Sequence, residues 1–366
     1  MDAFTQQPLL TCIGNKRKLI PQIIEVIRTV AKRLGKDRLR LVDACTGSGV
    51  VARHILPLAE VLYVNDLEEY AYVMARSVFE QPSPEQREAL RHHFQAMKEL
   101  IATGTYTEGV ITYHYAPACT SSIQINERCF YTHENALIID TLRSYITQQV
   151  SPELQHWCFA PLLVKASIHT NTSGVFKGFH KSEGIGCFGG KKGDALGRIM
   201  KPIAIELPIW SEEVVPVHCS QLDVVDLLST LPDNLDLIYL DPPYVSAPYG
   251  SNYFMLNLIL QGNMPSKVSK VSGIPSDWKR SAFNYHASAI TAMTELLART
   301  AKKAKYLLIS YNNEGLITPD EWRELFASYE VEVHTIEYEA YKGSRNYINR
   351  NTKVLELLYL VKFPSQ

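Results

Sequence analysis

Apolar residues recur along the chain in the spacing of alternating helices and strands. Residues 15–34 carry apolar side chains at helical spacing with charged residues between them, which predicts an amphipathic helix. Residues 39–45 (LRLVDAC) and 61–65 (VLYVN) are short apolar runs typical of buried strands, and residues 50–58 return to helical character between them. This alternation predicts a parallel α/β sheet.

The same pattern resumes after about residue 213. Three apolar strands and one helix follow, at residues 214–219, 235–240, 306–310 and 284–303. Two late strands near 330–338 and 353–362 flank a polar loop, 341–352. We expect these late strands to form an antiparallel hairpin that closes the sheet.

Residues 80–205 interrupt the alternation. Residues 82–100 are polar and helical in pattern, and residues 103–135 are rich in Tyr, Thr, Ser and His. Residues 165–201 are rich in glycine and carry seven basic residues, Lys165, Lys177, Lys181, Lys191, Lys192, Arg198 and Lys201. We therefore predict a catalytic domain formed by residues 1–79 and 206–366, with residues 80–205 inserted as a recognition region.

The amino-acid composition mainly excludes certain classes of protein. The 366 residues are 46% hydrophobic and 20% charged, with a net charge of -1, so only a local basic surface could bind nucleic acid. Seven dispersed cysteines form no C-x-x-C pair, which favours reduced thiols in a cytoplasmic protein and no metal site. No signal peptide or membrane span is expected from the pattern of apolar residues.

The first strand runs into a glycine-rich turn, Asp43-Ala44-Cys45-Thr46-Gly47-Ser48-Gly49. Glycines allow a tight turn and let a ligand approach the backbone closely. The turn lacks both the G-x-G-x-x-G and the P-loop patterns, and an acid before the glycines suits a ligand with an ammonium group, such as S-adenosylmethionine. Asp66 ends the next strand, where an acid commonly binds ribose hydroxyls. A purely structural strand-to-helix turn remains an alternative.

The strand at 235–240 runs directly into Asp241-Pro242-Pro243-Tyr244. The two prolines remove backbone donors and make a rigid turn at the edge where α/β sheets bind ligands. The Asp241 carboxylate and the Pro242 carbonyl could each accept an N–H of an exocyclic amino group, which would direct the nitrogen lone pair at a sulfonium methyl group. Pro243 would be a rigid spacer, and Tyr244 a flat face for a base.

Several segments together resemble the alpha group of DNA adenine-N6 methyltransferases, the D12 class that includes the Dam-type enzymes. The matching segments are Gly14 to Leu19 (GNKRKL), Asp43 to Gly49, Asn65-Asp66 and Asp241 to Tyr244. Thr172 to Gly178 and Ser310 to Gly315 are similar to FokI-type methyltransferases. The resemblance implies a class I S-adenosylmethionine-dependent methyltransferase, Rossmann-like, with a mostly parallel seven-stranded sheet.

The resemblance also implies residue roles. The cofactor would be contacted by Cys12, Gly14, Lys16, Asp43, Thr46, Gly47, Gly49, Asp66, Leu67, Asp223 and Asp241. Cys12 departs from the family, which often has an aromatic residue there, and Asp43 and Asp223 could instead be structural. The target adenine would be extruded from duplex DNA, with phosphates contacted by Lys177, Lys181, Lys191, Lys192 and Arg198. A solvated, flexible insertion is the alternative for these five residues.

The resemblance further implies a site-specific enzyme that acts as a monomer, encoded by a bacterium or phage, with a cognate restriction endonuclease as an optional partner. Methylation of an amino group in RNA or on a protein glutamine is an alternative, but those enzymes more often have Asn in place of Asp241. A DNA-binding regulator that has lost catalysis would carry damaged motifs. A restriction endonuclease is disfavoured because its P-D-x-n-D/E-x-K pattern does not stand out.

Overall fold

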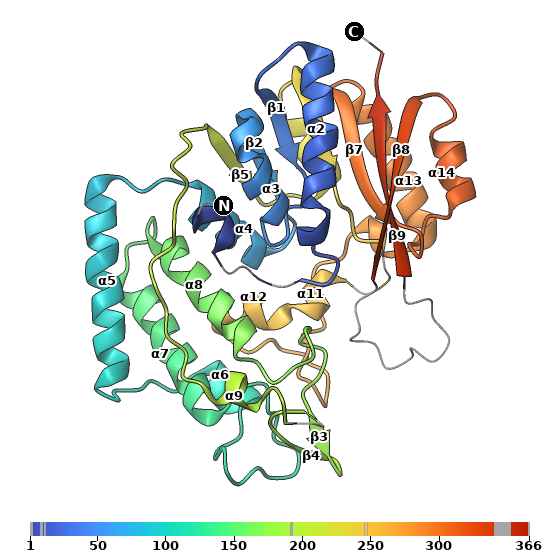
Figure 1. Ribbon diagram of the computed structural model, residues 1–366. Helices are drawn as coiled ribbons and strands as arrows, with labels where there is room; N and C mark the ends of the chain where they lie inside the picture. The colour runs from blue at the N-terminus through green and yellow to red at the C-terminus, as the bar shows by residue number, and fades with distance from the viewer. Residues whose placement is uncertain are drawn as a thin grey trace.

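The protein is described by a computed structural model, which covers residues 3–7, 10, 12–190, 193–244, 246, 248–339 and 353–364 (Figure 1). Its main sheet has seven strands in the order β5-β2-β1-β6-β7-β9-β8. Their bounds are β1 Leu39–Asp43, β2 Ala59–Asn65, β5 Val217–Ser220, β6 Leu235–Leu240, β7 Ala304–Asn312, β8 Glu330–Glu339 and β9 Lys353–Lys362. Pairing is parallel from β5 to β7, and β9 is antiparallel to both β7 and β8.

The predicted mostly parallel sheet with a closing hairpin is therefore confirmed. The loop predicted at 341–352 lies outside the described residues. Several boundaries differ from prediction by a few residues. The largest differences are that β5 begins at Val217 and that the first helix opens with a 3-10 turn, Arg17–Leu19, before α2 (Ile20–Leu34). Pro21 at the start of α2 explains the second difference, since proline is tolerated in the first helical turn, and Gly35 ends α2 with φ 63°.

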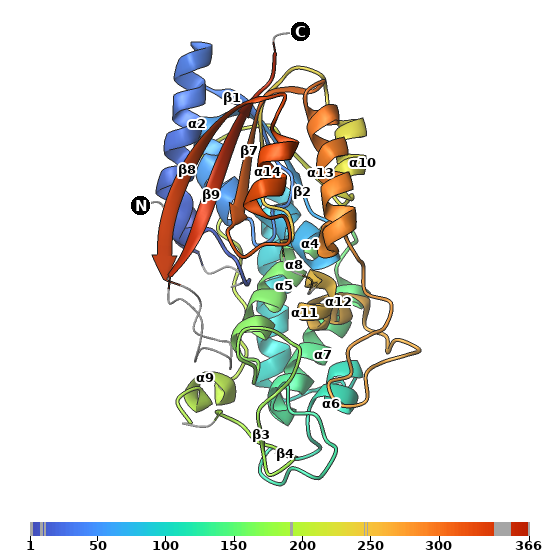
Figure 2. The same ribbon diagram turned by 90° about the vertical axis from the view of Figure 1, so that its right-hand side faces the viewer.

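Helices cover both faces of the sheet. Figure 2 shows α2 on one face, with α10 (Val224–Thr230) and α13 (His286–Thr300) on the other. Strand β6 is buried throughout, and from residue 237 to residue 240 its side chains alternate between two apolar clusters, as the two-residue repeat of a strand requires. Leu237 packs in the cluster with α2, and Ile238 packs in the cluster with α10 and α13. The remaining helices beside the sheet are α1 Ala3–Gln6, α3 Val50–Ile55, α4 Glu69–Phe79, α14 Pro319–Leu325 and the 3-10 turns Leu56–Leu58 and Ala282–Asn284.

The predicted insertion is mainly helical and lies beyond the carboxyl edge of the parallel strands (Figure 1). Its elements are α5 Pro84–Ala102, α6 Val110–Tyr115, α7 His133–Gln149, α8 Gln155–Ile168, α9 Leu196–Met200 and the short strands β3 Lys181–Ser182 and β4 Ile185–Gly186. Two later helices, α11 (Tyr249–Asn252) and α12 (Phe254–Gln261), follow β6, and α12 packs against α7 and α8. One apolar cluster joins Ile139 and Leu163 of the insertion to Leu41 of the sheet. The division into two domains stays a prediction.

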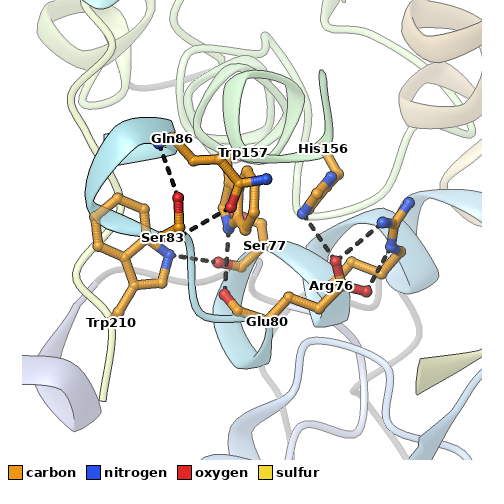
Figure 3. A network of polar contacts seen from close by, with 8 residues as sticks. All are labelled: Arg76, Ser77, Glu80, Ser83, Gln86, His156, Trp157 and Trp210. Atoms are coloured by element: carbon orange, nitrogen blue, oxygen red, sulfur yellow. Dashed lines mark hydrogen bonds and ion pairs between the residues drawn. The ribbon is translucent and has the colours of Figure 1, made fainter. Parts of the chain in front are cut away.

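A polar network joins the insertion to the helix that follows β2 (Figure 3). The Glu80 carboxylate accepts hydrogen bonds from Arg76 at 2.7 and 2.9 Å and lies 3.1 Å from Nε2 of buried His156 on α8. Burial acts to raise the pKa of Glu80, but the bonds with His156 and Arg76 outweigh it and lower that pKa to about 2. Trp157 Nε1 donates to the Glu80 carbonyl at 3.3 Å, and Trp210 Nε1 to the Ser77 carbonyl at 3.2 Å. The contacts of His156 and Trp157 with Glu80 attach α8 to the residue that ends α4, and the Trp210 bond attaches residue 210 to the same helix.

Candidate active site

A pocket opens where neighbouring strands β2, β1 and β6 end, because parallel strands place their carboxyl ends at one edge of the sheet. Ten of the eleven residues predicted to bind the cofactor line it: Cys12, Gly14, Lys16, Asp43, Thr46, Gly47, Asp66, Leu67, Asp223 and Asp241. The exception, Gly49, precedes α3 with φ 79°. Its conformation serves the turn itself, because L side chains rarely adopt positive φ. The fold thus brings together residues that are more than 200 positions apart.

Asp66 ties the first two strand ends together. Its Oδ2 accepts the Gly47 N–H at 2.7 Å, and its Oδ1 accepts the Glu68 N–H at 2.9 Å. Thr46 N donates to the carbonyl of Asn65 at 2.9 Å. The glycine turn is therefore held against the end of β2. Burial raises the pKa of Asp66, and the backbone N–H bonds oppose that shift.

Asp43 ends β1 and is fully buried. Its Oδ2 accepts from the Thr46 hydroxyl and from Ala52 N, both at 3.1 Å. Its Oδ1 is buried and has no hydrogen-bond partner among the described residues. Burial raises the pKa of this carboxyl from 3.8 to about 7, although the Thr46 bond lowers it. An acceptor without a partner in the pocket wall suits a ligand that brings its own donor.

Asp223 has a structural role in addition to its place in the pocket wall. It is the N-cap of α10, where its Oδ1 accepts from Val225 N at 2.9 Å, and it also lines the pocket. Capping gives this side chain a structural task, since an N-cap acceptor satisfies an amide at the helix start. A cofactor contact for Asp223 stays a prediction.

The Asp-Pro-Pro-Tyr turn leaves β6 at the same edge. The Tyr244 ring packs edge-on against Tyr311 of β7 at 5.6 Å, and the Tyr244 carbonyl accepts from Leu316 N at 3.1 Å. Gly14 approaches the tyrosine so closely that a Cβ there would lie 2.6 Å from the Tyr244 hydroxyl. The position of Tyr244 is therefore fixed from β7 on one side and from the N-terminal segment on the other.

Lys16 makes the most consequential contact of the N-terminal segment. Its Nζ lies 2.9 Å from Asp241 Oδ1 and 3.0 Å from Oε1 of Glu356, and only 2% of the residue is exposed. The same ammonium is 5.0 Å from the centre of the Tyr244 ring. Burial alone would lower the pKa of Lys16, but nearby Asp241 and the other anionic neighbours raise it well above its ordinary value. The resemblance predicted that Lys16 contacts the cofactor. In the structure, its ammonium group forms an ion pair with Asp241.

Asp241 is a further carboxylate of the pocket with a displaced pKa. Burial raises its pKa from 3.8 to about 7, Lys16 lowers it, and Glu356 raises it. Asp241 is therefore an acceptor whose charge depends on its neighbours. The Lys16 ammonium lies beside Oδ1, and the Asp241 side chain, which lines the pocket, remains 21% exposed.

Two tyrosines that sequence reasoning missed anchor the N-terminal segment. Tyr253 OH accepts from Ile13 N at 2.7 Å, and Tyr249 OH donates to the Ile13 carbonyl at 2.9 Å. Their rings stack at 5.9 Å. Their spacing of four residues just after the Pro-Pro turn was the only signal in the sequence, and it does not reveal the contact with residue 13.

The far wall of the pocket was also missed. It is formed by Lys279, Ser281, Phe283 and Asn284, which precede α13. Lys279 Nζ donates to the carbonyl of Leu67 at 3.1 Å, so this wall is tied to the end of β2. No motif marks residues 279–284, and only the chain path after α12 brings them here.

The described residues that were predicted to contact DNA differ in exposure. Lys177 and Lys181 are exposed, and Lys181 Nζ lies 4.9 Å from the centre of the Phe179 ring. Arg198 is partly buried and donates to the carbonyls of Ile168 and Thr170. Lys191 and Lys192 lie outside the described residues. The DNA-binding role of all five stays a prediction.

The strand order, the antiparallel hairpin and the pocket at the carboxyl edge define a class I methyltransferase fold. The profile of the family described as D12 class N6 adenine-specific DNA methyltransferase matches residues 13–325, and the chain belongs to that family. It is therefore a site-specific DNA methyltransferase that acts on adenine. The resemblance stated from the motifs is confirmed.

Relatives agree with this assignment. The chain is 29% identical to Type II methyltransferase M.NlaIII of Neisseria lactamica, over 93% of this chain and 95% of that protein. It is 27% identical to Type II methyltransferase M.CviAII of Paramecium bursaria Chlorella virus 1, over 87% of each. Type II methyltransferase M.FokI of Planomicrobium okeanokoites is 23% identical over 90% of this chain and 49% of its own length. Across the described ranges, no helix is both long and apolar enough to cross a membrane.

Proposed function

We propose that the pocket binds S-adenosylmethionine and that Asp241-Pro242-Pro243-Tyr244 forms the catalytic turn. The observation that carries the proposal is the buried Asp43 Oδ1 without a partner among the described residues, placed in the same pocket as Asp241. An ammonium group of the cofactor could donate to Asp43, and ribose hydroxyls could donate to Asp66. When bound, S-adenosylmethionine would supply an electrophilic methyl group on sulfur.

The residues of the turn would orient an extruded adenine. The exocyclic nitrogen is a poor nucleophile because its lone pair is delocalised into the ring. The free oxygen of Asp241 and the Pro242 carbonyl would accept its two N–H groups and draw the nitrogen toward tetrahedral geometry. The Tyr244 ring would support the base by stacking. Asp241 would also stabilise the positive charge that develops on nitrogen, inside a pocket with little water.

The direct test is Asp241→Ala, with Asp236→Asn on β6, the strand that Asp241 follows, as the control. Asp241→Ala should abolish methyl transfer from labelled S-adenosylmethionine to duplex DNA, while cofactor binding by calorimetry persists. Asp236 lies at the other end of β6, where it binds Lys36, so its substitution should leave the turnover of folded enzyme unchanged. Near wild-type transfer by Asp241→Ala would refute the catalytic assignment.

We propose that the insertion contacts the DNA backbone through Lys177, Lys181, Lys191, Lys192 and Arg198. The support is local: Lys177 and Lys181 are exposed, and Lys181 lies on β3 of the insertion, which extends beyond the carboxyl edge of the parallel strands (Figure 1). Removing one phosphate contact should flatten the slope of log affinity against log salt by about 0.9.

The double variant Lys177→Gln/Lys181→Gln tests this placement. Exposed Lys32 and Lys302 lie near the opposite edge of the sheet, so Lys32→Gln/Lys302→Gln is a control with the same change in charge. Binding of labelled duplex DNA across a salt series should weaken only for the first pair. Equal affinity and equal salt slope in both variants would exclude this surface.

Two relatives, M.NlaIII and M.CviAII, are Type II methyltransferases, and this similarity supports a further proposal for this chain. We infer that it acts as a monomer and protects DNA from a cognate restriction endonuclease. Mapping modified adenines in genomic DNA after incubation with the enzyme would give the site. Cleavage of fully modified DNA by every endonuclease known to cut that site would contradict the protective role.

A further inference from the structure

Glu356 is a buried carboxylate that precedes two leucines in its row of β9. Side chains of a strand alternate between faces, so Glu356 shares its face with Leu358 and Leu360, which belong to the apolar cluster on that side. Glu356 is 0% exposed. It accepts from the Ser310 hydroxyl at 2.6 Å and lies 3.0 Å from Lys16 Nζ. Burying a charged side chain at this position lowers the free energy of unfolding, so the presence of Glu356 needs a reason other than stability.

The charges around Lys16 connect Glu356 with Asp241 of the proposed catalytic turn. Lys16 is shared by two carboxylates, Asp241 and Glu356, and its Nζ is almost equally far from both, at 2.9 and 3.0 Å. If Glu356 were absent, Lys16 and Asp241 would form a closed neutral pair. The ammonium would then be free to move toward Asp241 and to compete with an amino group for its oxygens.

We propose that Glu356 is a positioning residue: it holds the Lys16 ammonium at one oxygen of Asp241 and so keeps the other oxygen available to the adenine amino group. Ser310 fixes the Glu356 carboxylate by donating to Oε1, the same oxygen that faces Lys16. The proposal rests on the catalytic role assigned to Asp241. It adds a residue more than 110 positions further along the chain.

The proposal predicts how activity depends on pH. Asp241 can stabilise the positive charge that develops on nitrogen only when it is ionised, so activity should fall as the pH drops through its pKa of about 7. Glu356 raises that pKa by repulsion. A neutral residue at 356 should therefore move the acid limb of the pH–activity profile, the range in which activity falls with falling pH, to lower pH. The titratable groups that face Asp241 from the surrounding elements are Lys16, Asp43, Cys45, Tyr239, Tyr249 and Glu356.

Glu356→Gln is the main variant, and Glu332→Gln is the matched control. Glu332 lies on the adjacent strand β8 and pairs with Arg33 at the surface. Glu356→Gln should lower kcat by about 10- to 100-fold, as expected for a displaced reacting group. Its acid limb should move to lower pH, and the KM for S-adenosylmethionine should change by less than about threefold. Glu332→Gln should match wild type in all three quantities.

A purely structural Glu356 would give a different result. It would change thermal stability or the active fraction and leave the acid limb where it is in wild type. A wild-type acid limb with kcat within about twofold of wild type would overturn the proposal. If Glu356→Gln does not fold, Glu356→Asp keeps the charge on a shorter side chain. It should retain the acid limb and reduce kcat, and wild-type kcat would overturn the proposal.

The outcome can be separated from that of the proposed function. If the Asp241→Ala variant is active, both the catalytic assignment of Asp241 and this inference are refuted. Inactive Asp241→Ala with fully active Glu356→Gln would remove only the inference.

Discussion

Gly14 offers the sharpest test of how the N-terminal segment shapes the active site. Its φ is 75°, and a Cβ at this position would lie 2.6 Å from the Tyr244 hydroxyl. Gly35, at the end of α2, has φ 63°, and a Cβ there would meet no atom within 4 Å. Substitution by Ala therefore carries the same backbone strain at both sites, and only Gly14→Ala adds a collision with the catalytic turn.

The magnitudes follow from that difference. An L residue in the left-handed region costs about 1–2 kcal/mol, so Gly35→Ala should lower stability by that much and leave activity unchanged. Gly14→Ala should lower stability by roughly a further 1–3 kcal/mol from overpacking. Reaching ordinary contact near 3.4 Å requires Tyr244 to move by several tenths of an ångström. A displacement of this size in a reacting geometry should lower kcat by about 10- to 100-fold.

Urea unfolding gives the stability of each variant, and single-turnover methyl transfer at saturating S-adenosylmethionine gives the rate of the chemical step. The comparison is between the two alanine variants, so the shared backbone cost cancels. If Gly14→Ala has the unfolding free energy and the turnover of Gly35→Ala, the close packing of Gly14 on Tyr244 does not position the base.

Two further substitutions test the buried carboxylates. Asp43→Asn should raise the free energy of unfolding above pH 7 by at least about 1 kcal/mol, because the native pKa of Asp43, about 7, exceeds its ordinary 3.8 and ionisation opposes folding there. The gain should vanish below about pH 4, and binding of S-adenosylmethionine should weaken; a gain that grows in acid would contradict this reasoning. Asp236→Asn should lower stability by about 1–2 kcal/mol at neutral pH, since Asp236 binds Lys36 at 2.7 Å and Arg40 N at 3.0 Å. Burial acts to raise the pKa of Asp236, but those bonds lower it. The loss of stability in Asp236→Asn should therefore shrink as acid protonates Asp236 in the wild type. Urea unfolding at several pH values measures this, and a loss that stays constant with pH would contradict it.

The mostly parallel sheet, its closing hairpin and the position of the pocket could be predicted from the sequence. Apolar strands that end in Asp43, Asp66 and Asp241 place three acids at one sheet edge, because the strands are parallel. The Pro-Pro pair fixes its own backbone locally, and the late strands form a hairpin because they are close in sequence. These features depend on local pattern and on the general geometry of α/β sheets, which a single sequence carries.

Contacts between distant segments were decided only by the tertiary structure. The pairing of Lys16 with Asp241 and Glu356 joins the N-terminal segment, β6 and β9, and no spacing in the sequence connects them. Tyr249 and Tyr253 anchor residue 13 for the same reason. Side-chain direction and burial set both the partner and the pKa of each charged group, and both arise only when the core packs. The sequence thus determined which reactive groups the pocket holds, while packing determined which of them share a charge.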